Sequence, residues 1–262
     1  MKIDFVKYQG TGNDFIILDN RNGTYDSLTE GTIKNLSSRH TGIGADGLML
    51  LNKLEGYDFE MKYYNADGRE SSMCGNGGRC IVKFAAAIGI SKNIYHFKAI
   101  DGDHEAEVNA SNNIKLKMKD IDEIDNRSNY FLVDTGSPHY VKYVDDLDIY
   151  DVYNKGKEIR YSSKFSEKGI NVNFVETIGP DEIYVRTYER GIENETLSCG
   201  TGVTAAAIVS AHNDNGFNLV VVKTPGGKLV VEFDKLDDNH FENIWLSGPA
   251  EFVFSGSINT KN

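Results

Sequence analysis

The chain has 262 residues, of which 40% are hydrophobic and 26% are charged, a composition typical of globular proteins. Its formal net charge of −11 argues against nucleic acid or an anionic membrane as a partner. The sequence has no signal region and no apolar run of about 18 residues, so we expect no membrane partner and a cytoplasmic location. Three cysteines are too few for a disulfide framework.

Sequence motifs for metals and cofactors are missing. No Cys/His cluster has the spacing of a zinc site, and no P-loop or dinucleotide fingerprint occurs. We therefore expect neither a metal nor a cofactor. The length suits one large or two medium domains.

The first half of the chain is predicted to consist mostly of strands. Alternating or continuous apolar residues indicate them, and glycine-rich turns separate them. Ile33 and Leu36 have helical spacing and predict a short surface helix over residues 29–39. A second helix begins after Cys74 and is expected to end at Gly89. The predicted strands are residues 2–8, 14–20, 48–51, 57–64, 94–100, 104–108 and 114–118.

A polar stretch, residues 120–129, separates the two halves and predicts a domain boundary. The second half then repeats the opening pair of strands. It contains a weaker amphipathic helix over residues 147–153 and a helix poor in charge after Cys199. The predicted strands are residues 130–134, 140–144, 171–176, 182–188, 219–223, 228–233, 243–246 and 251–254.

Two stretches with the pattern Cys-Gly-x-Gly begin at Cys74 and Cys199, and each leads into a helix that is small or apolar on nearly every side. Such a helix is buried. A cysteine at its N-terminus lies beside unpaired N–H groups and the positive end of the helix dipole, which favours a thiolate and can bind an anion. A lone cysteine there is more often structural, as we expect for Cys80 within the first helix, but a repeated pair favours catalysis.

The two cysteine motifs belong to an internal duplication. Cys74 and Cys199 are 125 residues apart, and Tyr64 and Tyr188 are 124 apart. A period this long indicates duplicated domains rather than solenoid repeats. We expect a mixed α/β fold, mostly antiparallel, with two pseudo-symmetric domains that each roll a sheet around a central helix. The two cysteines would then face each other across one cleft.

The ordered set of motifs resembles the diaminopimelate epimerase family over essentially the whole chain. Residues 64–70 (Tyr-Asn-Ala-Asp-Gly-Arg-Glu) and 73–77 (Met-Cys-Gly-Asn-Gly) resemble the first family signature. Residues 188–191 (Tyr-Glu-Arg-Gly), 195–196 (Glu-Thr) and 199–202 (Cys-Gly-Thr-Gly) resemble the second. Each Cys-Gly-x-Gly alone is a weak signal, whereas the ordered set is specific. Similar family motifs are Gly12-Asn13-Asp14-Phe15, Pro225-Gly226-Gly227 and Gly248-Pro249-Ala250-Glu251.

The resemblance implies two similar α/β domains with the active site between them, and a last strand that returns to the first domain. We expect an N-terminal half over residues 1–121, joined by residues 252–262, and a C-terminal half over residues 122–251. The implied reaction uses no cofactor and inverts one α-carbon, converting LL-diaminopimelate to the meso form for lysine and peptidoglycan synthesis. The expected partner is a small amino-acid substrate. A homodimer is a possible assembly, and the sequence does not decide the oligomeric state.

The chemistry requires a base on one face of the α-carbon and an acid on the other, because no cofactor supplies an electron sink. By the resemblance, Cys74 and Cys199 are that catalytic pair. His139 and Glu189 match positions that adjust the two thiol pKa values. A lone histidine is more often a structural residue. The positions expected to bind substrate are Asn13, Asn65, Gly75, Asn76, Asn171, Glu189, Arg190, Gly200 and Thr201.

These binding positions have a physical rationale. The helix starts at Gly75 and Gly200 offer backbone N–H groups to the α-carboxylate, and glycine allows close approach. Arg190 suits the distal carboxylate because its donors form a planar fork. Any one of the asparagines, taken alone, is better explained as a turn residue.

Two residues depart from the family pattern and leave other functions open. Ser137 stands where the family usually has asparagine before Pro-His, and Gly47 stands where many members have glutamine. The alternative enzyme is a related cofactor-free racemase of another amino acid, although proline racemase relatives usually have histidine at the position of Asn76. A catalytically silent amino-acid-binding protein is the alternative of another class, and retention of both cysteines argues against it.

Overall fold

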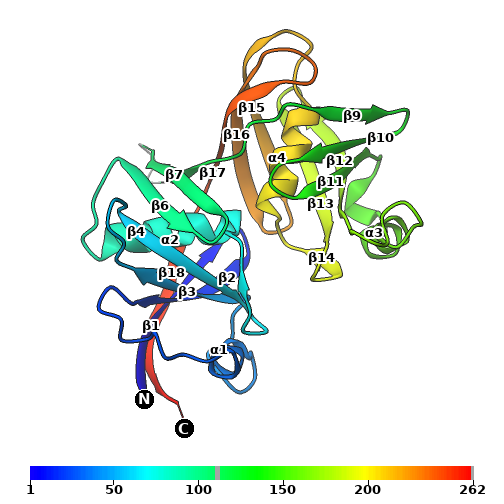
Figure 1. The fold of residues 1–262 in the computed structure, drawn as a ribbon. Coiled ribbons are helices and arrows are strands. Elements are labelled where there is room, and N and C mark those ends of the chain that lie inside the picture. The colour runs from blue at the N-terminus through cyan, green and yellow to red at the C-terminus, as the bar shows by residue number, and fades with distance from the viewer. Residues whose placement is uncertain (110–112, 261–262) are drawn as a thin grey trace. The chain divides into compact units, whose positions relative to one another are not determined.

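The computed structural model describes residues 1–109 and 113–260. The chain divides into two compact units, each with its own core. Unit 1 comprises Met1–Leu116 and Gly248–Asn262, and unit 2 comprises Lys117–Ser247 (Figure 1). The chain therefore leaves unit 1 once and returns to it at its C-terminal end.

Unit 1 is an eight-stranded mixed sheet with one short added strand. The pairs β2–β3 and β4–β6 are parallel and the other neighbours are antiparallel. The short strand β5 (Glu70–Ser71) pairs with β4. The order along the sheet is β18 (Glu251–Asn259), β1 (Lys2–Gly10), β2 (Asn13–Asp19), β3 (Gly47–Asn52), β4 (Phe59–Asn65), β6 (Ile94–Ala99), β7 (Gly102–Val108) and β8 (Ile114–Lys117).

Unit 2 repeats this topology. The pairs β11–β12 and β13–β15 are parallel, the other neighbours are antiparallel, and the short β14 (Asn194–Thr196) pairs with β13. The predicted pseudo-symmetry is confirmed, because β9 takes the place in unit 2 that β18 has in unit 1. The order is β9 (Ile124–Arg127), β10 (Tyr130–Asp134), β11 (Pro138–Tyr143), β12 (Asn171–Gly179), β13 (Glu182–Glu189), β15 (Gly216–Thr224), β16 (Gly227–Lys235) and β17 (Phe241–Gly248).

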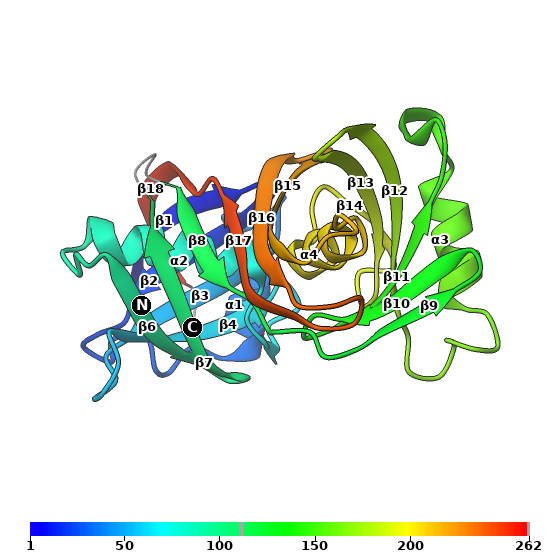
Figure 2. The same cartoon turned by 90° about the horizontal axis from the view of Figure 1, so that it is seen from above.

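One buried helix lies at the centre of each unit. In unit 1, α2 (Gly75–Ala87) packs against β1, β2 and β3, and it ends before Gly89 as predicted. In unit 2, α4 (Gly200–Val209) packs against β10–β13, β15 and β16, and Figure 2 shows it end-on among these strands. Glycine and alanine on both helices keep them thin enough for a sheet to pack closely around them.

One predicted element was wrong and one strand was missed. In place of a helix over residues 147–153, the structure has a short 3₁₀ turn (Leu147–Ile149) and then α3 (Val152–Arg160). The side chain of Asp151 caps α3 by accepting a hydrogen bond from the Asn154 amide, so the helix begins later than its apolar pattern indicated. The polar boundary also contains β9, whose backbone pairs with β10 although its side chains give no strand pattern. The surface helix α1 (Glu30–Ser37) is present within its predicted range.

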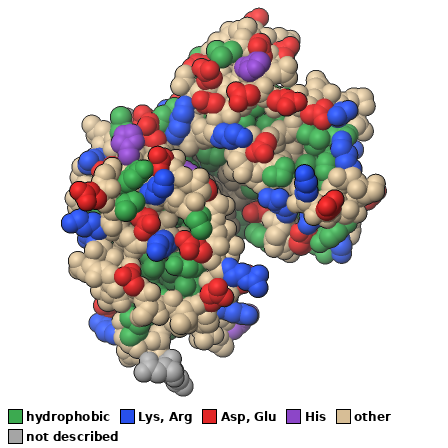
Figure 3. Space-filling view, in the orientation of Figure 1, with side chains coloured by type: hydrophobic (Ala, Val, Ile, Leu, Met, Phe, Trp, Pro, Cys, Tyr) green, Lys and Arg blue, Asp and Glu red, His purple; other side chains and the backbone are tan. Residues whose placement is uncertain are grey.

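The surface agrees with the acidic composition. On the face drawn in Figure 3, Asp and Glu side chains are interspersed with Lys and Arg. No helix in the described part of the chain is both long and apolar enough to cross a membrane.

Candidate active site

Cys74 and Cys199 occupy the same structural position in their units. Each is the N-cap of its central helix and has an extended backbone, with φ −90° and ψ 130° at Cys74 and φ −116° and ψ 112° at Cys199. The Cys74 carbonyl accepts from the Gly78 amide at 2.7 Å, and the Cys199 carbonyl accepts from the Val203 amide at 2.8 Å. Cys74 is partly exposed and Cys199 is buried. Each thiol therefore lies at the positive end of a helix dipole.

In unit 1, a chain of amides connects two of the predicted binding residues. The fully buried Asn76 donates from Nδ2 to Oδ1 of Asn13. Asn13 in turn donates from Nδ2 to the Asp46 carboxylate at 3.0 Å. Asn76 lies on α2 and Asn13 begins β2, so the packing of α2 against β2 brings them together.

Arg79 also contacts Asn76, and it was not predicted as a site residue. Its side chain is fully buried in the first turns of α2. It donates to Thr11 Oγ1 at 2.9 Å, to Asn76 Oδ1 at 2.8 Å and to the Gly75 carbonyl at 3.3 Å. The signal that could have found it is an arginine among the small and apolar residues of α2, because a buried charge requires a specific reason.

Asn65 and Gly47 lie opposite each other on the β3–β4 ladder. The Asn65 backbone closes a turn, because its amide donates to the Arg69 carbonyl and its carbonyl accepts from the Gly68 amide. A Cβ at Gly47 would lie 2.4 Å from the Tyr63 ring and 2.6 Å from the Tyr64 carbonyl oxygen. The space that glutamine would need at this position is therefore already filled in this chain.

In unit 2, three positions that are distant in sequence form one cluster. The Ser137 hydroxyl accepts from Asn171 Nδ2 at 2.9 Å and from the Arg190 guanidinium at 3.3 Å. The Arg190 amide donates to Asn171 Oδ1 at 2.9 Å, and its guanidinium also donates to the Lys168 carbonyl at 3.2 Å. Within the described residues, no carboxylate pairs with Arg190. The serine that departs from the family pattern thus joins two predicted binding residues.

The start of α4 is bordered by threonine hydroxyls. The Cys199 sulfur lies 3.5 Å from Thr201 Oγ1, and Thr135 Oγ1 donates to the Thr201 carbonyl at 2.9 Å. The Glu189 carboxylate accepts from Thr196 Oγ1 at 3.0 Å across the β13–β14 pair. Thr196 and Thr135 were not predicted as site residues.

His139 is buried and neutral. Burial lowers the pKa of the imidazole to about 3, and the positive charge of Arg190 acts in the same direction. Nδ1 of His139 lies 3.1 Å from Nδ2 of Asn173, which also donates to the Tyr140 carbonyl. Since the amide nitrogen can only donate, Nδ1 is the acceptor and the ring proton is on Nε2. No described group hydrogen-bonds to that Nε2 atom. Asn173 was missed because it looks like an ordinary strand residue.

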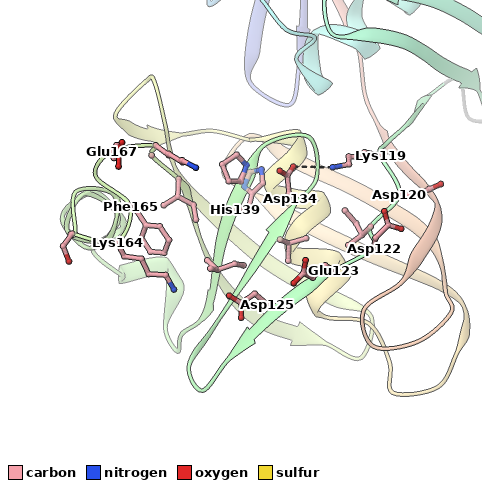
Figure 4. A pocket seen from close by; sticks show the side chains of 18 residues that line it. Lys119, Asp120, Asp122, Glu123, Asp125, Asp134, His139, Lys164, Phe165 and Glu167 are labelled. Atoms are coloured by element: carbon pink, nitrogen blue, oxygen red, sulfur yellow. Dashed lines mark ion pairs between the residues drawn. The ribbon is translucent and has the colours of Figure 1, made fainter.

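A cavity of about 720 Å³ in unit 2 reaches His139 (Figure 4). It lies between the segment from Lys119 to Asp125, strand β10 and the loop before β12, and both acidic and basic side chains line it. Lys119 and Asp134 are 4.0 Å apart on its wall. No group of three or more His, Cys, Asp or Glu suited to a metal ion occurs in the described ranges.

Comparison with known proteins identifies the family. A family model described as diaminopimelate epimerase matches residues 5–122 and 131–253. Curated proteins named diaminopimelate epimerase are similar along their whole length. The protein from Flavobacterium psychrophilum is 49% identical and covers 96% of this chain and 98% of its own. The protein from Chlorobaculum tepidum is 45% identical and covers 95% of this chain and 98% of its own.

Solved structures share the fold at low sequence identity. A PhzF-family phenazine biosynthesis protein from Bacillus anthracis superposes with a TM-score of 0.74 at 17% identity and covers 99% of this chain and 100% of its own. A hydroxyproline epimerase from Agrobacterium vitis superposes with a TM-score of 0.66 at 10% identity. It covers 98% of this chain and 91% of its own. With these matches spanning both units, the chain belongs to the diaminopimelate epimerase family of isomerases.

Proposed function

We propose that the protein interconverts LL-2,6-diaminopimelate and meso-2,6-diaminopimelate by a two-base mechanism that uses no cofactor. The observation that carries the proposal is the pair of cysteines, Cys74 and Cys199, at equivalent N-caps of two duplicated central helices. One residue of the pair would be a thiolate and the other a thiol. The product serves lysine synthesis and peptidoglycan precursor synthesis.

The proposed step is a proton transfer on each face of the α-carbon. The thiolate removes the α-hydrogen, and the other thiol delivers its proton to the opposite face, so the configuration inverts and the two sulfur atoms exchange protonation states. An α-hydrogen of an amino acid is a very weak acid. The α-carboxylate must therefore be stabilised as it gains charge, and the N–H groups of Gly75, Asn76, Gly200 and Thr201 are the proposed donors.

The second amino-acid group of the substrate requires its own contacts. We assign its carboxylate to Arg190, supported by the lack of a carboxylate partner for this cation among the described residues. Asn171 holds the Arg190 backbone, and Asn13 and Asn65 complete the proposed binding set. Neutral His139, which carries its proton on Nε2, is assigned a hydrogen-bond donor role towards the reacting groups, and Glu189 an adjusting role near Cys199.

A racemase of another amino acid is the second candidate. The observation that favours it is Ser137, which contacts both Asn171 and Arg190 where the family usually has a longer side chain. The two candidates predict different substrates. Incubation in D₂O with LL-diaminopimelate, meso-diaminopimelate and a panel of single L-amino acids, followed by NMR of the α-hydrogen, distinguishes them by which compound gains deuterium.

The cysteine variants test the mechanism separately from the substrate. Cys74→Ala and Cys199→Ala should each abolish net epimerisation, because each lacks the acid or the base for one face. Each should still exchange the α-hydrogen of one stereoisomer through the remaining thiol, and the preferred isomer should switch between the two variants. Cys80→Ala is the matched control, since Cys80 is fully buried in α2. Full epimerase activity in either N-cap variant would refute the two-thiol mechanism.

Location and assembly remain proposals. We propose a cytoplasmic location, because no disulfide joins the three cysteines, all of which lie in the described part of the chain. The acidic net charge gives nucleic acid no electrostatic reason to bind.

We propose a homodimer because Phe252, Val253 and Phe254 on β18 are each at least 43% exposed, and a second copy could cover them. A monomeric mass in light scattering at micromolar concentration would contradict this assembly.

A further inference from the structure

A two-residue turn occupies the same place in each unit. In unit 1, residues 100–101 connect β6 to β7, and in unit 2, residues 225–226 connect β15 to β16. The residue after each turn is a glycine with positive φ, 132° in unit 1 and 139° in unit 2. Asp101 and Gly226 are therefore equivalent positions of the two duplicated halves.

Both of these turn residues hydrogen-bond to the segment that leads into the central helix. The Asp101 carboxylate accepts from the amide of Met73, one residue before the N-cap of α2, at 3.2 Å. The Gly226 amide donates to the carbonyl of Leu197, two residues before the N-cap of α4, at 2.8 Å. Each unit thus connects the approach to its catalytic cysteine to the same turn. Unit 2 makes this contact with backbone alone, whereas unit 1 depends on a side chain.

The Asp101 side chain has a second partner. His104 stacks on Phe97, a fully buried residue opposite it on the β6–β7 ladder, with ring centroids 5.2 Å apart. Nε2 of His104 lies 3.2 Å from the Asp101 carboxylate. Burial opposes ionisation of Asp101, but hydrogen bonds with His104 and the Met73 amide outweigh it and hold the Asp101 pKa below its usual value. The acceptor for the Met73 amide is therefore an ionised carboxylate, which makes a stronger hydrogen bond than a neutral group does.

Cys74 lies between this contact and helix α2. Its carbonyl accepts from the Gly78 amide at 2.7 Å, which fixes the helix side of the residue. A Cβ at Gly78 would lie 2.9 Å from the Met73 sulfur, so the Met73 side chain packs against the beginning of α2. The Asp101 hydrogen bond then fixes the Met73 backbone to the β6–β7 turn. The residue directly before the thiol is thus held by both the helix and the sheet.

We propose that Asp101 is a positioning residue for Cys74, which holds the Met73 backbone so that the thiol meets the α-carbon of the substrate. The inference rests on the proposed two-cysteine function and adds a residue to it. Asp101 acts through Met73 and need not touch substrate. Proton transfer depends steeply on placement, because a shift of about 1 Å can slow an enzymatic step about a hundredfold.

The experiment measures α-hydrogen exchange in D₂O by NMR in proteins that retain one N-cap cysteine, with each stereoisomer of diaminopimelate. The Cys199→Ala protein reports exchange through Cys74, and the Cys74→Ala protein reports exchange through Cys199. Asp101→Ala should slow exchange through Cys74 by about tenfold or more and leave exchange through Cys199 unchanged. Asp101→Asn retains an acceptor oxygen and should keep most of the exchange through Cys74. A general loss of stability would instead slow both reactions.

Asp103→Ala is the matched control on the same hairpin. Asp103 pairs with Lys98 and Tyr57, and its side chain is 68% exposed. This variant should leave exchange through either cysteine unchanged. Equal slowing through both cysteines by Asp101→Ala, or the same rates in Asp101→Ala and Asp103→Ala, would overturn the proposal.

Hydrogen exchange of the Met73 amide tests the contact without turnover. This amide should be protected in the wild type and in Asp101→Asn, and it should exchange about tenfold faster or more in Asp101→Ala. An unprotected Met73 amide in the wild type would overturn the proposal without any variant. A wild-type protein that exchanges no α-hydrogen of diaminopimelate would contradict the proposed function, and the Met73 amide would then decide this inference alone.

Discussion

The Asn76 side chain shows how neighbours fix the orientation of a single amide. Its Oδ1 accepts from both Thr11 and Arg79, so its Nδ2 must face Asn13. Asn13 is oriented in turn, because its own Nδ2 faces the Asp46 carboxylate. Donor and acceptor positions at this part of the site are therefore determined by groups that need not touch substrate.

Replacing Arg190 tests the proposed contact with the distal carboxylate. Arg190→Ala should weaken binding of diaminopimelate by roughly tenfold to a hundredfold, since a hydrogen bond to a charged group contributes about 1.5–3 kcal/mol. The folded protein should otherwise be little changed, because the side chain is exposed and only donates to Ser137 and the Lys168 carbonyl. Isothermal titration with substrate on a Cys74→Ala background measures the affinity. Wild-type affinity in the double variant would reject the contact.

The pH dependence of His139 follows from its burial. Its pKa in the folded state is about 3, below the ordinary value of about 6.5. Above pH 6.5 the ring is neutral in both the folded and the unfolded state, so it does not make the stability of the fold depend on pH. Between pH 6.5 and pH 3 the unfolded chain binds a proton that the folded chain does not, so stability falls as pH falls.

The corresponding measurement is ¹⁵N NMR of the histidine rings. We expect His139 to show the Nε2-protonated neutral pattern without change from pH 7.5 to pH 4.5. Asn173→Asp should alter this pattern, because a carboxylate beside Nδ1 favours a proton on that atom. Asn218→Asp, which changes a buried asparagine elsewhere in unit 2, is the control. Titration of the wild-type His139 near pH 6.5 would contradict the assignment.

At the scale of elements, helix α3 depends on one close approach. A Cβ at Gly156 would lie 2.3 Å from the Tyr188 Cβ on β13, and this neighbour is too near the backbone to move freely. The glycine therefore sets the distance between α3 and the sheet. In α1, by contrast, a Cβ at Gly31 would meet no atom closer than 3.9 Å.

These two helix glycines predict opposite effects of the same substitution. Gly156→Ala should destabilise unit 2 by about 1–3 kcal/mol or more, because it overpacks the α3–β13 contact. Gly31→Ala should stabilise the protein by up to about 1 kcal/mol, since alanine is the better helix former and the site has room. Urea unfolding of the two variants measures both values. A neutral Gly156→Ala variant would show that α3 can move away from the sheet at no cost.

At the scale of the whole molecule, unit 1 depends on the end of the chain. Strand β18 pairs with β1 from Lys2 opposite Asn259 to Gln9 opposite Glu251. Aromatic rings join the two strands, with centroid distances of 5.8 Å both for Phe5 and Phe254 and for Tyr8 and Phe252. The order of synthesis therefore does not match the order of the units, because unit 1 lacks one strand until β18, which follows unit 2 in the sequence, is made.

Ending the chain after Gly248 should destabilise unit 1 selectively. The truncated protein loses the pairing partner of β1 and the aromatic contacts across it, whereas every strand of unit 2 is retained. Hydrogen exchange should show faster exchange in β1 and β2 and unchanged protection in β12 and β13. Equal loss of protection in both units would mean that they unfold as one cooperative body.

Local sequence determined the elements and the duplicated cysteine positions. Apolar periodicity marked nearly all strands, and small apolar residues after Cys74 and Cys199 marked two buried helices, because these signals depend on neighbours within a few residues. The polar β9 and the late start of α3 were missed, since one depends on backbone pairing and the other on the Asp151 cap.

Tertiary structure decided which side chains meet. Arg79 contacts Thr11, 68 residues away in the chain, and Arg190 contacts Ser137, 53 residues away. No periodicity predicts such pairs, because they arise when parallel and antiparallel strand pairing brings separate loops to one end of a sheet. The sequence alone therefore determined two equivalent cysteines. Folding determined that a buried cation, Arg79, contacts the Gly75 carbonyl, whereas a neutral hydroxyl, that of Thr204, contacts the matching Gly200 carbonyl.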